Sequence, residues 1–192
     1  MKISNTELLR YAKQIILKKI GISGQKKISA AKVLITGVGG LGCPLALYLA
    51  NTGIGNIGII DNDKVDISNL NRQVLFNTDD IGKHKVVQAK KFLNKTNKKI
   101  KINIYKNRLN EKNIKKILSK YDIICDCSDN FTTRYLLNSF CFKSKKILIS
   151  AAISKFDAHI FNFNFTKNIP CYECFMPEIP DEENKCDTEG IL

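Results

Sequence analysis

Strand-length segments alternate with segments of helical character through most of the chain. The strand-length segments are residues 32–36, 57–60, 100–104, 123–127 and 147–150. The helical segments are residues 41–52, 83–94, 110–118 and the stretch through Leu136, Leu137 and Phe140. This alternation predicts a Rossmann-like, open and mostly parallel α/β sheet, with ligands at the carboxyl ends of its strands. The helix at 41–52 is apolar nearly all round, so we expect it to be deeply buried.

The pattern differs at the two ends of the chain. Ser4 and Glu7 form a capping box ahead of an apolar stripe, which predicts a helix to about Lys19. Residues 21–25 are expected to break it, and a short second helix to span 25–30. Residues 161–165 alternate apolar and polar side chains, as an antiparallel strand does. We therefore expect one domain in three parts: N-terminal helices (1–31), a core (32–152), and an antiparallel strand with a cysteine loop (153–192).

Composition narrows the class of protein. Hydrophobic residues make up 44% of the 192 residues, and no apolar run reaches the length of a membrane span. The first residues lack the apolar stretch of a signal peptide, which favours a cytoplasmic protein. The net charge is +13, but the lysines are scattered through every segment without a block of like charge. Nucleic acid is therefore not expected to be the main ligand.

A glycine-rich turn links the first core strand to the first core helix: Gly37-Val38-Gly39-Gly40-Leu41-Gly42. Glycines at this spacing allow a tight turn, and they let backbone N–H groups at the helix start face phosphate oxygens. A purely structural turn is the alternative, but the flanking strand and helix favour nucleotide binding. Asp61 ends the second strand, close to the interval of about 20 residues at which an acidic side chain reaches a nucleotide ribose.

Charged residues beyond the turn indicate which nucleotide binds. Residues 62–82 form a long, polar connection, and connections of that length are usually functional or disordered. Arg72 and Lys85 suggest a triphosphate, whose charge must be held by cations. Asp129 follows the fourth strand and is placed for a magnesium ion that bridges phosphate oxygens. Asp126 lies inside that strand, where a structural role stays open.

The seven cysteines are expected to be reduced, because the chain lacks a secretion signal. Four lie in apolar surroundings and should pack as small hydrophobes: Cys43, Cys125, Cys127 and Cys141. Three lie in polar, loop-like sequence and are candidates for metal binding or thiol chemistry: Cys171, Cys174 and Cys186.

Six motifs follow one another along the chain: Arg10-Tyr11-Ala12-Lys13-Gln14, the glycine turn, Asp61-Asn62-Asp63, Ser68-Asn69-Leu70-Asn71-Arg72-Gln73, Gly82-Lys83-His84-Lys85 and Asp126-Cys127-Ser128-Asp129-Asn130. Together they resemble the motifs of the adenylyltransferases that activate ubiquitin-like sulfur carriers. This is the ThiF/MoeB/HesA family, which is related to the E1 ubiquitin-activating enzymes. The resemblance covers nearly the whole chain and implies an E1-like activating-enzyme fold.

The resemblance also implies a reaction that uses ATP and Mg²⁺. The C-terminal Gly-Gly carboxylate of a carrier, of the molybdopterin-synthase or thiamine type, attacks the α-phosphate and gives an acyl-adenylate and pyrophosphate. The family's catalytic positions match Arg72, Lys85 and Asp129. Its nucleotide-binding positions match Gly37, Gly39, Gly40, Gly42, Asp61, Asp63, Ser68, Asn69, Leu70, Asn71, Arg72, Lys85, Asp129 and Asn130. Fixed cations suit this chemistry, because attack at the α-phosphate builds negative charge.

Three further features of the family are only partly matched. Its first helix supplies an arginine to the ATP of the other subunit of a homodimer, and the matching residue here is Lys13, which keeps the charge but not the bidentate fork. Cys171 and Cys174 match the first half of a structural zinc site, which needs four ligands, so Zn²⁺ is expected at half a site only. Cys186 resembles a loop cysteine that in some relatives forms a thioester or persulfide with the carrier, and in others does not. The chain ends where the family usually continues, so we expect a shortened protein, a truncated gene product or one part of a split enzyme.

Three alternatives stay open. A tRNA-modifying dehydratase of the same superfamily would suit the basic charge. A non-catalytic nucleotide-binding relative would suit the short C-terminus. A dehydrogenase using NAD comes last, because it leaves Arg72, Lys85 and Asp129 unexplained.

Overall fold

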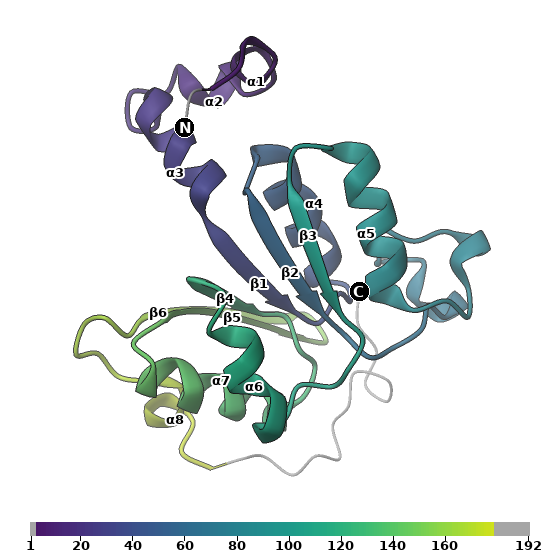
Figure 1. Cartoon of the computed structure of the whole chain (residues 1–192). Helices are drawn as coiled ribbons and strands as arrows, with labels where there is room; N and C mark the ends of the chain where they lie inside the picture. Colours follow the sequence, from purple (N-terminus) through teal and green to yellow (C-terminus); the bar gives the residue numbers. More distant parts are fainter. Residues whose placement is uncertain (1–2, 179–192) are drawn as a thin grey trace.

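The computed structural model describes residues 3–178, which form a six-stranded sheet with helices on both faces (Figure 1). The strand order is β3-β2-β1-β4-β5-β6. The first five strands are parallel and β6 is antiparallel to β5, which confirms the expected mostly parallel sheet with an antiparallel extension. The strands are β1 (Lys32–Thr36), β2 (Asn56–Ile60), β3 (Lys101–Tyr105), β4 (Ile123–Asp126), β5 (Ile147–Ser154) and β6 (Asp157–Asn164).

The core helices begin and end close to their predicted positions, whereas the N-terminal ones do not. The helices are α1 (Asn5–Arg10), α2 (Ala12–Ile15), α3 (Gly21–Ala30), α4 (Gly42–Thr52), α5 (Lys85–Thr96), α6 (Glu111–Leu118), α7 (Phe131–Lys143) and α8 (Tyr172–Phe175). The capping box of Ser4 and Glu7 starts α1, but the helix is interrupted at Tyr11. The prediction that residues 21–25 break the helix is wrong. Gly21 turns the chain with a φ of 57°, and α3 continues from there.

The two faces of the sheet carry separate clusters of buried side chains. Val33 and Ile35 of β1 pack with α4 and α5 on one face. Leu34 of β1, together with Ile124 of β4 and Leu148 of β5, packs with α6 and α7 on the other. Because successive strand residues point to opposite faces, β1 is covered on both sides and forms the centre of the core.

Helix α4 is covered on one side only, which corrects the expectation that it is deeply buried. Its Tyr48 is 70% exposed, and Leu45 and Leu49 border an apolar groove of about 340 Å³. The opposite wall of this α4 groove includes Ile149 of β5 and Ile160 of β6, and Ile160 is 77% exposed. The all-round apolar character of α4 is therefore only partly explained by contacts within this chain.

The N-terminal helices pack against the ends of α4 and α5 that are remote from the glycine turn. Tyr11 is buried there, and its hydroxyl accepts a hydrogen bond from Asn97 Nδ2 at 3.0 Å. The side-chain amides of Gln14 and Gln25 both donate to the Thr52 carbonyl oxygen, at 3.0 and 3.2 Å. Figure 1 shows α1 to α3 at the opposite end of the sheet from the carboxyl ends of β1 and β2.

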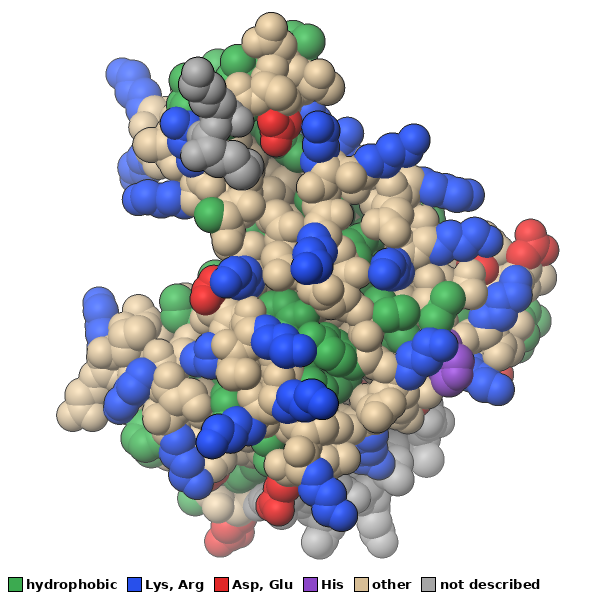
Figure 2. Space-filling model, in the orientation of Figure 1, with side chains coloured by type: hydrophobic (Ala, Val, Ile, Leu, Met, Phe, Trp, Pro, Cys, Tyr) green, Lys and Arg blue, Asp and Glu red, His purple; other side chains and the backbone are tan. Residues whose placement is uncertain are grey.

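The antiparallel strand belongs to the same sheet as the core. β5 runs from Ile147 to Ser154, so the expected boundary between residues 152 and 153 falls inside a strand. Lys and Arg side chains are spread over the whole face seen in Figure 2 and do not gather in one patch. Within residues 3–178, no helix is both long enough and apolar enough to cross a membrane.

Candidate nucleotide-binding site

The sheet reverses its strand order between β1 and β4, and open α/β sheets bind ligands in the crevice at such a switch point. The glycine turn follows β1, and residues 127–130 follow β4. These two segments touch, because a Cβ atom built on Gly37 would lie 2.7 Å from the Cys127 carbonyl oxygen. The structure therefore brings the predicted glycine turn and the predicted metal-binding segment together.

The glycines of the turn are of two kinds. Gly37 has a φ of 83°, and a Cβ atom on Gly42 would lie 2.0 Å from the Gly37 carbonyl oxygen, so the fold itself excludes side chains at both positions. Gly39 and Gly40 do not have left-handed φ values. The atoms nearest to their built Cβ positions are Gln73 Nε2 at 3.8 Å and Arg72 Cγ and Cδ at 3.4 Å, which are ordinary contact distances. The packing of the described residues therefore does not require glycine at positions 39 and 40.

Asp61 stabilises the turn from the end of β2. Its Oδ2 accepts a hydrogen bond from the Val38 N–H at 2.9 Å, and its Oδ1 accepts one from the Asp63 N–H at 2.8 Å. Burial raises the pKa of Asp61, although these two N–H groups and the charge of Lys85 oppose the increase. Each carboxylate oxygen has a second lone pair, so Asp61 can also accept a bond from a ribose hydroxyl.

Lys85 lies at the start of α5 and pairs with Asp63. Its Nζ is 3.0 Å from Asp63 Oδ2, and its side chain is 8% exposed while that of Asp63 is 54% exposed. The Lys85 N–H also donates to the Asp63 carbonyl oxygen at 3.0 Å. Lys85 is thus held near the turn by a carboxylate that is open to water and that a phosphate can replace.

Arg72, in the 62–82 connection, lies against the turn beside Gln73. Its aliphatic stem lies over Gly40, and its Nη1 donates to the Ser68 carbonyl oxygen at 2.8 Å and to Asn71 Oδ1 at 3.0 Å. The other predicted residues hold the loop itself. Ser68 and Asn69 bond with Asp66 in a capping box, and Leu70 is partly buried against the core.

Asp129 and Asn130 differ in their roles. Asn130 caps α7, since its Oδ1 accepts a bond from the Thr133 N–H at 2.9 Å. Its Nδ2 donates to Oδ1 of the exposed Asp129 at 3.2 Å. Mg²⁺ is commonly bound by one or two carboxylates together with phosphate oxygens and waters, so a single exposed carboxylate here fits that ion. Residues 3–178 contain no cluster of three or more metal-binding side chains.

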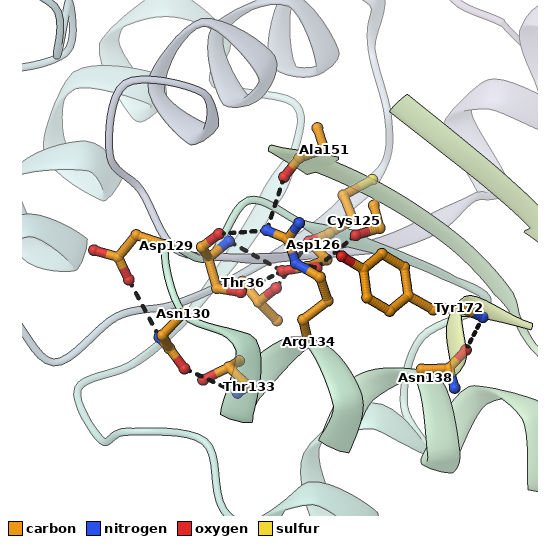
Figure 3. Close-up of polar contacts among 12 residues, drawn as sticks. Thr36, Cys125, Asp126, Asp129, Asn130, Thr133, Arg134, Asn138, Ala151 and Tyr172 are labelled. Atoms are coloured by element: carbon orange, nitrogen blue, oxygen red, sulfur yellow. Dashed lines mark hydrogen bonds and ion pairs between the residues drawn. The ribbon is translucent and has the colours of Figure 1, made fainter. Parts of the chain in front are cut away.

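The sequence did not indicate the ion pair that lies behind this segment. Arg134 of α7 approaches Asp126 with 3.3 Å between Nε and Oδ2, and both side chains are buried (Figure 3). Asp126 thus has the structural role that the sequence left open. The available signal was Arg134 itself, a cation in the otherwise uncharged stretch Phe131–Phe142 that closely follows Asp126 in sequence.

The cysteines fall into the two expected groups as far as the structure describes them. Burial raises the pKa of Cys43, Cys125 and Cys141 to about 12, as for inert core thiols. Cys171 and Cys174 have their sulfur atoms 3.8 Å apart. Two thiolates at about 2.3 Å from one tetrahedral ion would be separated by about 3.8 Å, so the pair fits half of a zinc site.

The environment of Cys171 differs from that of the core thiols. Partial burial acts to raise its pKa, but hydrogen bonds from Asn138 and Cys174 outweigh it, so the pKa is lowered. Cys186, which resembles the loop cysteine that forms a covalent link in some relatives, lies outside the described residues.

Lys13 does not join the site of its own chain. It is exposed on α2, near the end of α4 that is remote from the glycine turn. Arg10 is already bonded, with Nη2 donating to the Thr96 carbonyl oxygen at 2.7 Å. Any contact of Lys13 with a nucleotide therefore requires a second chain.

A glycine turn at the switch point of a parallel sheet, with a carboxylate after β2 and two cations nearby, is typical of Rossmann-like nucleotide-binding domains. The chain matches the ThiF family over residues 11–192 and belongs to that family. This confirms the resemblance seen in its motifs.

Named relatives agree with this membership. Adenylyltransferase and sulfurtransferase MOCS3 of Culex quinquefasciatus is 42% identical over 100% of this chain and 44% of its own length. Adenylyltransferase and sulfurtransferase UBA4 of Debaryomyces hansenii is 43% identical over 98% of this chain and 43% of its own length. The chain thus spans less than half of these relatives. The crystal structure of E. coli MccB with ATP superposes with a TM-score of 0.76 and 30% identity, covering 88% of this chain and 52% of MccB.

Proposed function

We propose that this chain binds ATP at the carboxyl edge of β1, β2 and β4 and adenylates the C-terminal glycine of a ubiquitin-like sulfur-carrier protein. The observation that carries the proposal is the pair Gly39 and Gly40, where the fold does not itself require glycine and against which the Arg72 side chain lies. Family membership and the names of the relatives support the same reaction class.

The side chains suit attack of a carboxylate on the α-phosphate. A carrier carboxylate is ionised at neutral pH, so it needs orientation rather than a general base. Its oxygen forms a bond to the α-phosphorus while the bond to the bridging oxygen breaks, and the electron pair leaves with pyrophosphate. Arg72 and Lys85 would stabilise the charge that builds up on the phosphate oxygens, and Lys85 would exchange its half-exposed partner Asp63 for a phosphate. Asp129 would hold Mg²⁺, which when bound neutralises phosphate charge.

The second copy of this chain is the partner that would complete the site. The α4 groove leaves apolar residues of α4 and of the sheet exposed. Lys13 lies at the end of the sheet opposite to the candidate site of its own chain. A homodimer that covers the groove would bury these residues and bring Lys13 of one copy to the ATP of the other.

Zn²⁺ at Cys171 and Cys174 and a covalent step at Cys186 remain predictions.

The test is ATP–pyrophosphate exchange with candidate carriers that end in Gly-Gly. Exchange that requires a carrier and is abolished by Asp129→Ala supports the proposal. ATP binding without exchange for any carrier would favour a non-catalytic nucleotide-binding relative. Turnover that depends on tRNA instead would favour the dehydratase.

Replacement of Arg72 tests the reaction at a single residue. Arg72→Ala should lower exchange about 10²- to 10³-fold, the loss that follows removal of one group that stabilises transition-state charge. Arg10→Ala is the matched control, because each arginine donates to one backbone carbonyl oxygen and only Arg72 borders the turn. Arg10→Ala should keep exchange within about twofold. An Arg72→Ala protein that fails to fold would count against the assignment of Arg72 to catalysis.

A further inference from the structure

Asp126 and Arg134 form a buried ion pair next to the candidate site. Asp126 is fully buried and Arg134 is 5% exposed. Burial of two charges is costly, so such a pair persists only where its remaining polar atoms also find partners. The identity of those partners therefore indicates what the pair does.

Both members of the pair bond to Ser128, the residue immediately before Asp129. Asp126 Oδ1 accepts hydrogen bonds from the Ser128 N–H, at 3.0 Å, and from its hydroxyl. Arg134 Nη2 donates to the Ser128 carbonyl oxygen at 2.9 Å (Figure 3). Because both backbone polar groups of Ser128 are held, the backbone that carries the exposed Asp129 carboxylate has little freedom to move.

The pair is anchored to β5 on its far side. Ser150 Oγ donates to Asp126 Oδ2 at 2.7 Å, and Arg134 Nη2 also donates to the Ala151 carbonyl oxygen at 3.2 Å. The segment after β4 is thus connected to the neighbouring strand through two side chains as well as through the sheet.

Tyr172 packs against the guanidinium group from the segment that contains the two paired cysteines. Its ring centroid is 5.7 Å from Arg134 Cζ, a distance at which a cation and an aromatic face attract. Tyr172 is itself buried, and its N–H donates to Asn138 Oδ1 of α7 at 2.9 Å. It lies between Cys171 and Cys174 in sequence, so the cysteine segment is part of the support around Arg134.

We propose that Arg134 is a positioning residue of the adenylation site. Paired with Asp126 and packed against Tyr172, it fixes Ser128 and thereby the place of the Asp129 carboxylate. The expected effect of Arg134 on Mg²⁺ binding rests on the proposed function. The positioning of Ser128 does not. The geometry can be tested on the protein without any ligand.

Amide hydrogen exchange of Ser128 in the ligand-free protein tests the geometry. Arg134→Lys keeps the charge but cannot contact Asp126, Ser128 and Ala151 at once, so the Ser128 amide should exchange about tenfold faster. The double variant Asp126→Asn/Arg134→Gln serves if Arg134→Lys does not fold, because it removes both charges and leaves no unpaired buried ion. It should also speed exchange of the Ser128 amide. Asp129→Ala is the reference variant, because it removes the carboxylate while leaving Ser128 exchange as in the wild type.

Mg²⁺-dependent binding of ATP, measured by calorimetry, tests the consequence. In Arg134→Lys, the Mg²⁺ concentration that gives half of the Mg²⁺-dependent increase in ATP affinity should rise about tenfold. Metal affinity usually falls by about this factor when a residue that orients a metal ligand is changed. Affinity for ATP in EDTA should change less than about twofold. A purely structural role would lower both affinities together.

Tyr172 variants test the contribution of the cysteine segment. Tyr172→Leu removes the aromatic face and should speed Ser128 exchange, whereas Tyr172→Phe keeps the face and should not. Unchanged Ser128 exchange in folded Arg134→Lys and in the double variant would overturn the proposal. Faster exchange with wild-type Mg²⁺ dependence would overturn the link to Asp129. A wild-type protein that binds no ATP would overturn the proposed function, while the exchange data would still decide whether Arg134 positions Ser128.

Discussion

The two halves of the candidate site hold their charged groups in opposite ways. Next to β2, Lys85 pairs with Asp63, whose side chain is 54% exposed. Next to β4, Arg134 pairs with Asp126, whose side chain is fully buried. The first pair can be opened by a ligand that offers a better anion, whereas the second is closed to ligands and bonds to the backbone. The comparison separates groups that a substrate can use from groups that keep a loop in place.

Replacement of glycines in the turn should give the largest contrast. In Gly42→Ala the new Cβ atom would lie 2.0 Å from a backbone oxygen, and backbone cannot move aside as a flexible side chain can. We expect no folded protein, or a fall in Tm of about 10 °C or more. Gly40→Ala should fold with a stability change within about 1 kcal/mol. Its affinity for ATP should fall about tenfold, because the methyl group would lie against the Arg72 stem, where we expect the nucleotide to approach the turn.

Thermal unfolding and calorimetric titration with ATP check both glycine variants. Wild-type ATP affinity in Gly40→Ala would show that the nucleotide does not lie against Gly40. A stable Gly42→Ala protein would contradict the steric distinction between the two kinds of glycine.

The two ion pairs should differ in their contribution to stability. Arg134→Gln leaves Asp126 buried without its cation and should lower the free energy of unfolding by about 3–5 kcal/mol. Asp63→Asn removes a carboxylate that is 54% exposed and screened by water, and the new amide oxygen can still accept from Lys85, so about 1 kcal/mol or less is expected. Urea unfolding of both variants measures the difference. Equal losses would remove the distinction between an exchangeable pair and a fixed one.

The reactivity of Cys125 and Cys171 toward alkylation should show the smallest of these differences, and it reports on single residues. The thiolate is the reactive form, so alkylation increases as the pH rises through the pKa of each thiol. Cys125, next to Asp126, has its pKa raised to about 12 by burial, whereas the pKa of Cys171 is lowered. At pH near 8, iodoacetamide should therefore modify Cys171 in the folded protein and reach Cys125 only in denaturant. Mass spectrometry identifies the modified residues, and rapid labelling of Cys125 in the folded protein would contradict its place in the fixed half.

The strands and the glycine turn could be predicted because their signals are local. The segment 32–36, the capping box at Ser4 and the Asn110 cap of α6 each follow from a few neighbouring residues, and the structure contains them as expected. Local signals failed at residues 21–25, where a glycine that normally ends a helix instead begins one.

The missing parts depend on side-chain contacts between different elements. Asp126 and Arg134 occur in different elements, and nothing in either motif indicates that their side chains meet behind Ser128. The apolar surface of α4 predicts burial but not the identity of the covering surface, and this chain covers one side of the helix. The sequence therefore indicates candidate ligand-binding residues, but it does not indicate which residues support them.

The central place of β1 also affects the order in which the chain can fold. β1 pairs with β2 on one side and with β4 on the other, and β4 is not complete until Asp126. A chain emerging from the ribosome can form β1, β2 and β3 with α4 and α5 once Tyr105 is available. Until β4 arrives, the central strand of the future sheet is an unpaired apolar edge, which is prone to pair with other chains. The reversal of strand order that forms the crevice thus makes the nascent protein most vulnerable to aggregation between the synthesis of Tyr105 and Asp126.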